Sequence, residues 1–205
     1  VVVTADGYAL TNFHVVKPAG NYMQCSMADG ELYDAVIVGI DPGNSGAIAF
    51  LDTDGCTIRI VDMPTFEFET TKKRVSIDPY GIVAEMQQYD LHHVYMEEVY
   101  SSPQMGVVSA FNFGEGKGKI LGIVAAMGVP VTSVKPSRWK KDMKVPADKR
   151  AAVQRASQLF PGAAPAFKGP RGGVFDGRAE AALLALYGAL ELGCAPTAPV
   201  TLQGE

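Results

Sequence analysis

The chain has 205 residues, 47% hydrophobic and 20% charged, a composition that excludes disordered and fibrous proteins. This length suits one medium domain, alone or with an appendage. No apolar run reaches the length of a membrane span. The three cysteines, Cys25, Cys56 and Cys194, lie far apart without a CxxC pair, which argues against a disulfide or zinc framework and favours a reducing compartment.

Charge is unevenly distributed along the chain. The formal net charge of −4 at first disfavours nucleic acid as a partner. Between Glu115 and Arg178, however, thirteen Lys/Arg stand against four Asp/Glu, whereas the rest of the chain has five against eighteen. This asymmetry is typical of a phosphate-binding face on an otherwise acidic protein, although several solvated helix faces would give the same counts.

The first third of the chain is rich in short β-type runs. Within residues 1–34, turns at Asp6-Gly7 and Asp29-Gly30 lie between apolar runs and predict β-hairpins. Strands are expected next over 35–40, 47–51 and 57–62, followed by a polar loop over 64–76.

The remaining chain alternates between helical and extended patterns. We expect helices over 79–88, 117–127, 146–159 and 176–192, strands over 94–96 and 129–134, a loop or broken helix over 106–113, a mobile Gly/Pro-rich segment over 161–175 and a disordered tail over 195–205. This order predicts an α/β fold, in which a mixed β-sheet carries an antiparallel meander and helices cover its faces.

Four carboxylates stand at the ends of these elements. Asp41 closes the strand 35–40 and opens a Gly-rich turn, and Glu97 closes the strand 94–96. Asp176 and Glu180 are four residues apart at the start of the last helix, so both project from one face. Clustered acids need a cation, and hard oxygen ligands suit Mg²⁺ or Mn²⁺. Two such ions, roughly 3.5–4 Å apart, activate a water and stabilise a leaving oxygen in phosphodiester hydrolysis.

Each acid also has a simpler interpretation. A single carboxylate at a strand end is commonly a turn or cap residue, and Asp176 alone would serve as a helix N-cap. Glu98 competes with Glu97, because strand alternation lets only one of the two face a site.

Several ordered motifs resemble the RuvC-type Holliday-junction resolvases, nucleases with an RNase H-like fold. The segment VGIDPGNSGA at 38–47 resembles their first motif, and YMEEVY at 95–100 resembles their second acidic strand. The segments SAFNFG at 109–114, KPSRWKK at 135–141 and DGRAEAAL at 176–183 resemble later blocks of phage-type members, and plastid resolvases share much of the pattern. The resemblance covers about residues 35–192.

The resemblance implies an RNase H-like mixed sheet flanked by helices, in a homodimer that nicks a four-way DNA junction symmetrically with Mg²⁺ or Mn²⁺. Asp41, Glu97, Asp176 and Glu180 match the metal-binding catalytic acids of the family. The bacterial enzymes have two aspartates three apart in the last motif. Here the last two acids are four apart and the second is Glu180, which is closer to the phage and plastid pattern. The expected location is the cytoplasm of a bacterial or phage-infected cell, or a plastid stroma.

Basic and aromatic residues of the same region are candidates for DNA contact. Phosphate contacts, which position DNA without reading its sequence, are expected from the basic side chains. These are Lys117, Lys119, Lys135, Arg138, Lys140, Lys141, Lys144 and Arg178. Tyr100, Phe111 and Phe113 are candidates for stacking on opened bases, with core packing as the alternative for the two phenylalanines. Trp139 is expected to pack and to contact DNA in part.

Residues 1–41 carry a second resemblance, and most of this segment precedes the resolvase-like part. The segment VVVTADGYALTNFHVV at 1–16 resembles the part of HtrA/Deg-type serine proteases that carries the catalytic histidine, here His14. Gly43-Asn44-Ser45-Gly46 imitates the serine motif, but it follows His14 too closely, and no orienting acid or second barrel half is present. We therefore expect a non-catalytic β appendage over 1–34, followed by a nuclease domain over 35–194.

The sequence thus predicts a metal-dependent endonuclease acting on Holliday junctions. One alternative is a branched-DNA-binding protein of the same fold that does not cleave. Others are a trypsin-like protease fragment and an actin/hexokinase-like phosphotransferase, but the latter fold needs two similar halves.

Overall fold

The computed structural model describes residues 36–53, 56–69, 73–100, 104–146, 148, 150–169 and 173–203, together with two short N-terminal strands. These strands, β1 (Val2–Val3) and β2 (Ala9–Leu10), pair antiparallel, as expected for a hairpin in this segment. His14, Cys25 and the other features expected within residues 1–34 lie outside the described residues.

A six-stranded mixed sheet forms the centre of the fold, in the order β10-β5-β4-β3-β8-β9. An antiparallel meander is built from β3 (Val36–Asp41), β4 (Ala47–Asp52) and β5 (Thr57–Asp62). On the other side of β3, β8 (Leu91–Glu97) and β9 (Val131–Val134) run parallel to it. The α/β fold class predicted from the sequence is confirmed.

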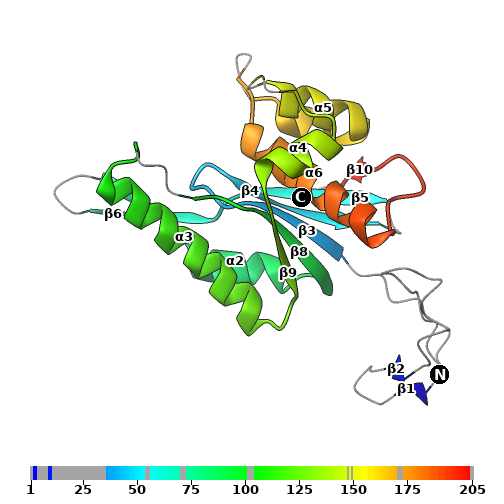
Figure 1. Cartoon of the computed structure of the whole chain (residues 1–205), viewed down its shortest axis with the longest axis horizontal. Coiled ribbons are helices and arrows are strands. Elements are labelled where there is room, and N and C mark those ends of the chain that lie inside the picture. Colours follow the sequence, from blue (N-terminus) through cyan, green and yellow to red (C-terminus); the bar gives the residue numbers. More distant parts are fainter. Residues whose placement is uncertain are drawn as a thin grey trace.

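Helices cover both faces of this sheet (Figure 1). One face carries α6 (Asp176–Leu192), α5 (Ala151–Leu159), the short α4 (Pro136–Asp142) and the 3-10 helix η2 (Pro161–Phe167). The other face carries α2 (Pro79–Met86) and α3 (Val107–Ala126). None of the described helices has the length and apolar character needed to cross a bilayer.

Gly39 lets α6 approach the central strand closely. A Cβ atom at this position would lie 2.1 Å from the carbonyl oxygen of Ala181 and 2.4 Å from the amide nitrogen of Ala185. Only a glycine in β3 accommodates this contact, because real Cβ atoms do not approach backbone so closely. The close packing fixes the start of α6 relative to the end of β3.

Several expected elements differ from the structure. Residues over 64–76 were expected to form a loop, but β6 (Thr65–Glu69) and β7 (Lys73–Ile77) form an antiparallel hairpin. β6 is exposed and β7 is buried at Ile77, and apolar residues recur at every second position of the hairpin. Cross-strand pairing, including the Lys73–Glu67 ion pair, outweighs the polar composition of these strands. Residues 107–113 form the start of α3, with Gly106 as its N-cap, so the loop or broken helix expected over 106–113 is wrong. The helix expected over 146–159 begins at Ala151, and α4 was not expected.

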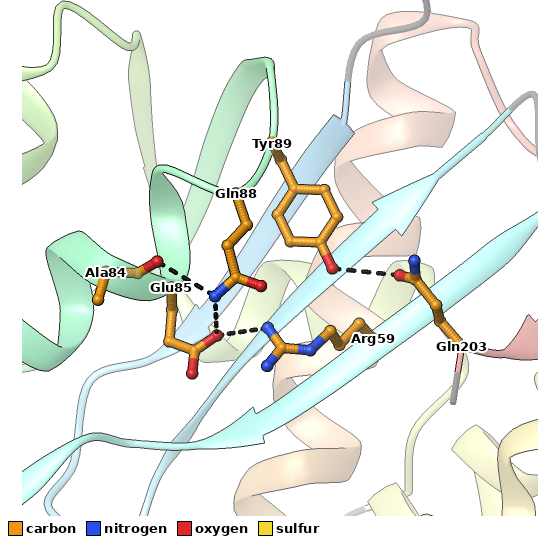
Figure 2. Close-up of polar contacts among 6 residues, drawn as sticks. All are labelled: Arg59, Ala84, Glu85, Gln88, Tyr89 and Gln203. Carbon is orange, nitrogen blue, oxygen red and sulfur yellow. Dashed lines mark hydrogen bonds and ion pairs between the residues drawn. The ribbon is translucent and has the colours of Figure 1, made fainter. Parts of the chain in front are cut away.

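The expectation of a disordered tail over 195–205 is wrong for its described part. β10 (Thr201–Leu202) adds a parallel strand beside β5, and Val200 is buried. The hydroxyl of Tyr89 donates a hydrogen bond of 3.1 Å to Gln203 Oε1 (Figure 2). Figure 2 also shows the neighbouring Arg59–Glu85 ion pair, which joins β5 to α2. Backbone pairing and these contacts fix a segment whose Ala/Pro composition had indicated disorder. Similarly, residues 161–167 of the segment expected to be mobile form η2.

Candidate active site

Asp41 and Glu97 end two neighbouring parallel strands. Asp41 is the last residue of β3 and Glu97 the last of β8, and the register of the strands places these ends side by side. Because side chains alternate along a strand, Asp41 shares a face with Gly39, and Glu97 shares a face with Tyr95. Gly39 and Tyr95 both contact α6, so the two carboxylates lie on the side of the sheet that α6 covers.

The first turn of α6 brings the other two acids to this place. A Cβ atom at Gly177 would lie 2.7 Å from Ser45 O and 3.1 Å from Asp41 Oδ2, so the helix begins directly against the turn that follows β3. Asp41, Asp176 and Glu180 line one cavity of about 250 Å³. Glu180 is half-buried, whereas Asp176 is exposed. The structure therefore brings the predicted acids together, with Asp176 at the rim.

α4 completes the site with two residues. The indole Nε1–H of Trp139 donates a 3.0 Å hydrogen bond to Glu97 Oε1. Lys140 Nζ lies 2.7 Å from Glu180 Oε1 and 3.8 Å from Glu97 Oε1. Trp139 is fully buried, so the expected partial contact with DNA is wrong. The sequence did not predict either contact with the acids; its only signal was the resolvase-like KPSRWKK block.

Glu97, and not Glu98, belongs to this cluster. Glu97 is 8% exposed and contacts Trp139 and Lys140, while Glu98 accepts a hydrogen bond from the hydroxyl of Tyr100. The choice that the sequence left open is thereby decided by the alternation of β8.

The carboxylates perturb one another. Burial first, and then the charges of Glu180, Glu97 and Asp176, together raise the pKa of Asp41 to about 7, although the hydrogen bond with the Gly43 amide opposes the shift. The pKa of Glu97 is also raised, by burial and then by Glu180, although Lys140 and Trp139 oppose the shift. Burial favours a lower pKa for Lys140, but its hydrogen bond with Glu180 and the surrounding negative charge outweigh burial and raise that pKa. The cluster is thus a region of concentrated negative potential that attracts a cation.

The donor types of this cluster fit a hard divalent ion. The carboxylates come to this place from two strands and one helix, and oxygen is the ligand type that Mg²⁺ and Mn²⁺ prefer. Within the part of the chain that the structure describes, no three Asp, Glu, His or Cys side chains are already arranged as a metal centre. The carboxylates would therefore have to move closer together to bind an ion. Lys140 now lies between Glu180 and Glu97.

The predicted phosphate-binding residues occupy different environments. Lys135, Lys141 and Lys144 are exposed in or beside α4. Arg138 pairs with Glu191, and Lys119 pairs with Glu115 and donates to Ser76. Arg178 forms a two-pronged contact of 2.6 Å with both carboxylate oxygens of Asp62, which lowers the pKa of Asp62. The guanidinium of Arg178 therefore joins α6 to the end of β5.

The aromatic candidates lie on the α3 side of the site. Tyr100 is 69% exposed and Phe111 70% exposed, so Phe111 is not a core residue. Lys117 Nζ lies 5.1 Å from the centre of the Tyr100 ring and donates to Val99 O at 3.2 Å. Phe113 is half-buried and lines a cavity of about 280 Å³ with Asn44. Asn44 also lines the cavity of the acids, so the two cavities adjoin.

Comparison with solved structures shows a RuvC-like fold. The chain is similar to Thermus thermophilus RuvC, both alone and in complex with Holliday junction substrate. The TM-scores are 0.51 for the complex and 0.50 for RuvC alone, with 16% and 17% identity. Each match covers 78% of this chain and 98% of the RuvC chain. At this level of identity the similarity shows the fold, an RNase H-like mixed sheet flanked by helices.

Sequence comparison finds a different, local similarity. The chain matches probable periplasmic serine endoproteases, DegP-like, of Chlamydia trachomatis (45% identity) and Chlamydia muridarum (43% identity), over 47 residues in each case. These matches cover 23% of this chain and only 9% of each protease. No protein-family model matches the chain.

Proposed function

We propose that the chain is a structure-selective endonuclease of DNA recombination and repair, which resolves Holliday junctions by paired symmetric nicks. The observation that carries the proposal is the cluster of Asp41, Glu97 and Glu180 at one end of a RuvC-like sheet, in which Lys140 pairs with the two glutamates. The match with a RuvC structure that contains a junction supports branched DNA as the substrate class.

Asp41, Glu97 and Glu180, with Asp176 at the rim, would hold Mg²⁺ or Mn²⁺, as two ions in the proposed site. When bound, such ions supply Lewis-acid stabilisation of the phosphate and a water that attacks phosphorus at neutral pH. The residues of the chain provide position: two strand ends and the start of α6 fix the carboxylates, and Trp139 orients Glu97 through its indole N–H. Products would keep a 5′-phosphate and a 3′-hydroxyl.

Exposed basic and aromatic residues would hold the junction. Lys135, Lys141 and Lys144 offer exposed ammonium groups for phosphates near α4. Tyr100, supported by Lys117 beneath its ring, and Phe111 offer flat surfaces for stacking on unpaired bases. A homodimer would supply two such sites, as symmetric nicking requires. Residues 1–34 would form a non-catalytic appendage to the nuclease domain.

Cleavage of a synthetic four-way junction in Mg²⁺ tests the proposal. We expect the full chain to nick two strands of the junction at symmetric positions. It should leave a linear duplex of the same sequence uncut. Asp41→Asn and Glu97→Gln should lose cleavage while retaining junction binding. Glu98→Gln is the matched control, because it changes the neighbouring acid outside the cluster, and it should cleave normally.

Two outcomes would contradict this function. Undiminished cleavage by Asp41→Asn and Glu97→Gln would place the chemistry elsewhere. Tight junction binding by the unmodified chain, without cleavage in Mg²⁺ or Mn²⁺, would instead identify a branched-DNA-binding protein that does not cleave.

A further inference from the structure

The ammonium group of Lys140 lies within the carboxylate cluster. It forms a close ion pair with Glu180 and a longer one with Glu97, at 2.7 and 3.8 Å. Its side chain is 34% exposed, so a path to solvent remains open. Lys140 also lines a second cavity, of about 270 Å³, together with Asp176 and Glu180. The ammonium therefore occupies the region of negative potential where a divalent ion would bind.

The backbone of α4 holds Lys140 in this position. Its neighbour Trp139 is fully buried, and Met143, one turn later, is 4% exposed. The amide of Val145 donates a 2.8 Å hydrogen bond to the carbonyl of Lys140. Because its backbone is anchored on both sides, the Lys140 side chain is directed into the cluster and differs from a surface lysine that meets an acid by chance.

We propose that Lys140 is a built-in counter-ion, which competes with divalent metal for Glu180 and Glu97 and is displaced when metal binds. The inference rests on the proposed metal-dependent function. A carboxylate oxygen that accepts a 2.7 Å hydrogen bond from an ammonium cannot at the same time coordinate an ion along that direction. Lys140 thus stabilises the acids in the metal-free protein and lowers their metal affinity. Once displaced, its tethered ammonium would remain beside the cavity, where a phosphate would enter.

Calorimetric titration of the full chain with Mn²⁺ at pH 8 tests this competition. Lys140→Met keeps the length of the side chain but removes its charge. We expect it to bind Mn²⁺ about tenfold more tightly than the unmodified chain, because a positive charge is removed from the site. Lys73→Met, which breaks the exposed Lys73–Glu67 pair, is the matched control and should bind Mn²⁺ unchanged. The emission of Trp139, the single tryptophan, provides a second measurement, since its N–H contacts Glu97.

Stability gives an independent readout. Without metal, Lys140→Met should melt at a lower temperature than the unmodified chain, and saturating Mn²⁺ should raise its melting temperature by a larger amount. If Lys140→Met fails to fold, Lys140→Gln serves the same comparison. Equal or weaker Mn²⁺ binding by the folded variant would overturn the inference and leave the proposed function intact. Absence of Mn²⁺ binding by every protein would overturn the proposed function and this inference with it.

Discussion

The indole N–H of Trp139 lies 3.0 Å from Glu97 Oε1, and this contact links α4 to the end of β8 inside the protein. Both side chains are buried, so each supplies the hydrogen-bond partner that water would otherwise provide to the other. The same hydrogen bond lowers the pKa of Glu97 against the effect of burial. One contact thus serves both the packing of α4 and the ionisation of a proposed metal ligand.

Trp139→Phe should destabilise the protein by about 1–3 kcal/mol, since it leaves a buried carboxylate oxygen without its donor. It should also raise the pKa of Glu97 further and move the pH of half-maximal cleavage upward. Urea denaturation and a pH–rate profile measure the two effects. Tyr100→Phe, which removes only the exposed Tyr100–Glu98 hydrogen bond, should change neither. A stable Trp139→Phe variant with an unshifted pH profile would contradict the role given to this bond.

The ionisation of Asp41 should make the stability of the metal-free protein depend on pH. Its pKa rises from 3.8 in the unfolded chain to about 7 in the folded chain, so the folded state binds the proton more tightly. The resulting stability is complete below about pH 4 and is lost as the pH rises to about 7, on the order of 4 kcal/mol in total.

Asp41→Asn removes this titration. In excess chelator, it should differ little from the unmodified chain near pH 4 and be clearly more stable at pH 8. Urea denaturation of both proteins at the two pH values measures the difference. A constant difference between them across this range would show that Asp41 ionises normally in the folded protein.

The close contact between α6 and the turn after β3 depends on the absence of a side chain at Gly177. Gly177→Ala would place a Cβ atom 2.7 Å from the Ser45 carbonyl oxygen, which is backbone and cannot rotate away. We expect a loss of about 1–3 kcal/mol in unfolding free energy and weaker Mn²⁺ binding, because the start of α6 must shift away from Asp41.

Gly122→Ala is the control for this substitution. Nothing lies within 4 Å of a Cβ atom at Gly122 in α3, so alanine should stabilise the helix by about 0.5–1 kcal/mol. Thermal denaturation and Mn²⁺ titration of both variants compare the two sites. Equal behaviour of the two variants would argue against a close α6–turn contact.

The two ends of the chain should differ in their importance. A chain without residues 1–34 should still cleave junctions, because the proposed site draws no residue from that segment. A chain ending at residue 194 should be less stable, since it loses the β10–β5 pairing, the buried Val200 and the Tyr89–Gln203 hydrogen bond. Cleavage assays and thermal denaturation distinguish the two truncations. Loss of cleavage after removal of residues 1–34 would make that segment part of the nuclease.

The sequence predicted the elements in which local pattern and tertiary environment agree. The strands over 36–41, 47–52 and 57–62 and the helix from Asp176 carry apolar patterns that match their burial. Asp41 and Glu97 were grouped because each ends a predicted strand and matches a resolvase-like motif, and the parallel pairing of β3 and β8 places these two ends side by side. These features required no knowledge of which side chain touches which.

Other features depend on contacts that local pattern does not contain. The pairing of Lys140 with Glu180 joins residues 40 positions apart, and its geometry depends on α4, a seven-residue helix that begins at a proline. In α3, several glycines lower helix propensity, but a tertiary contact such as Gly116 against Ile77 favours the helix. β10 is only two residues long, and its existence is decided by the exposed edge of β5.

That short strand has a further consequence for solubility. The outer edge of a β-sheet presents unpaired backbone groups, which can template pairing with another molecule. Here the amides of Thr201 and Gln203 donate to the carbonyls of Cys56 and Ile58, at 2.9 Å each, and so occupy the first part of that edge of β5. Two residues form a poor template for a neighbouring chain, whereas the six residues of β5 would form a good one. β10 therefore shortens the stretch of β5 that is open to edge-to-edge pairing.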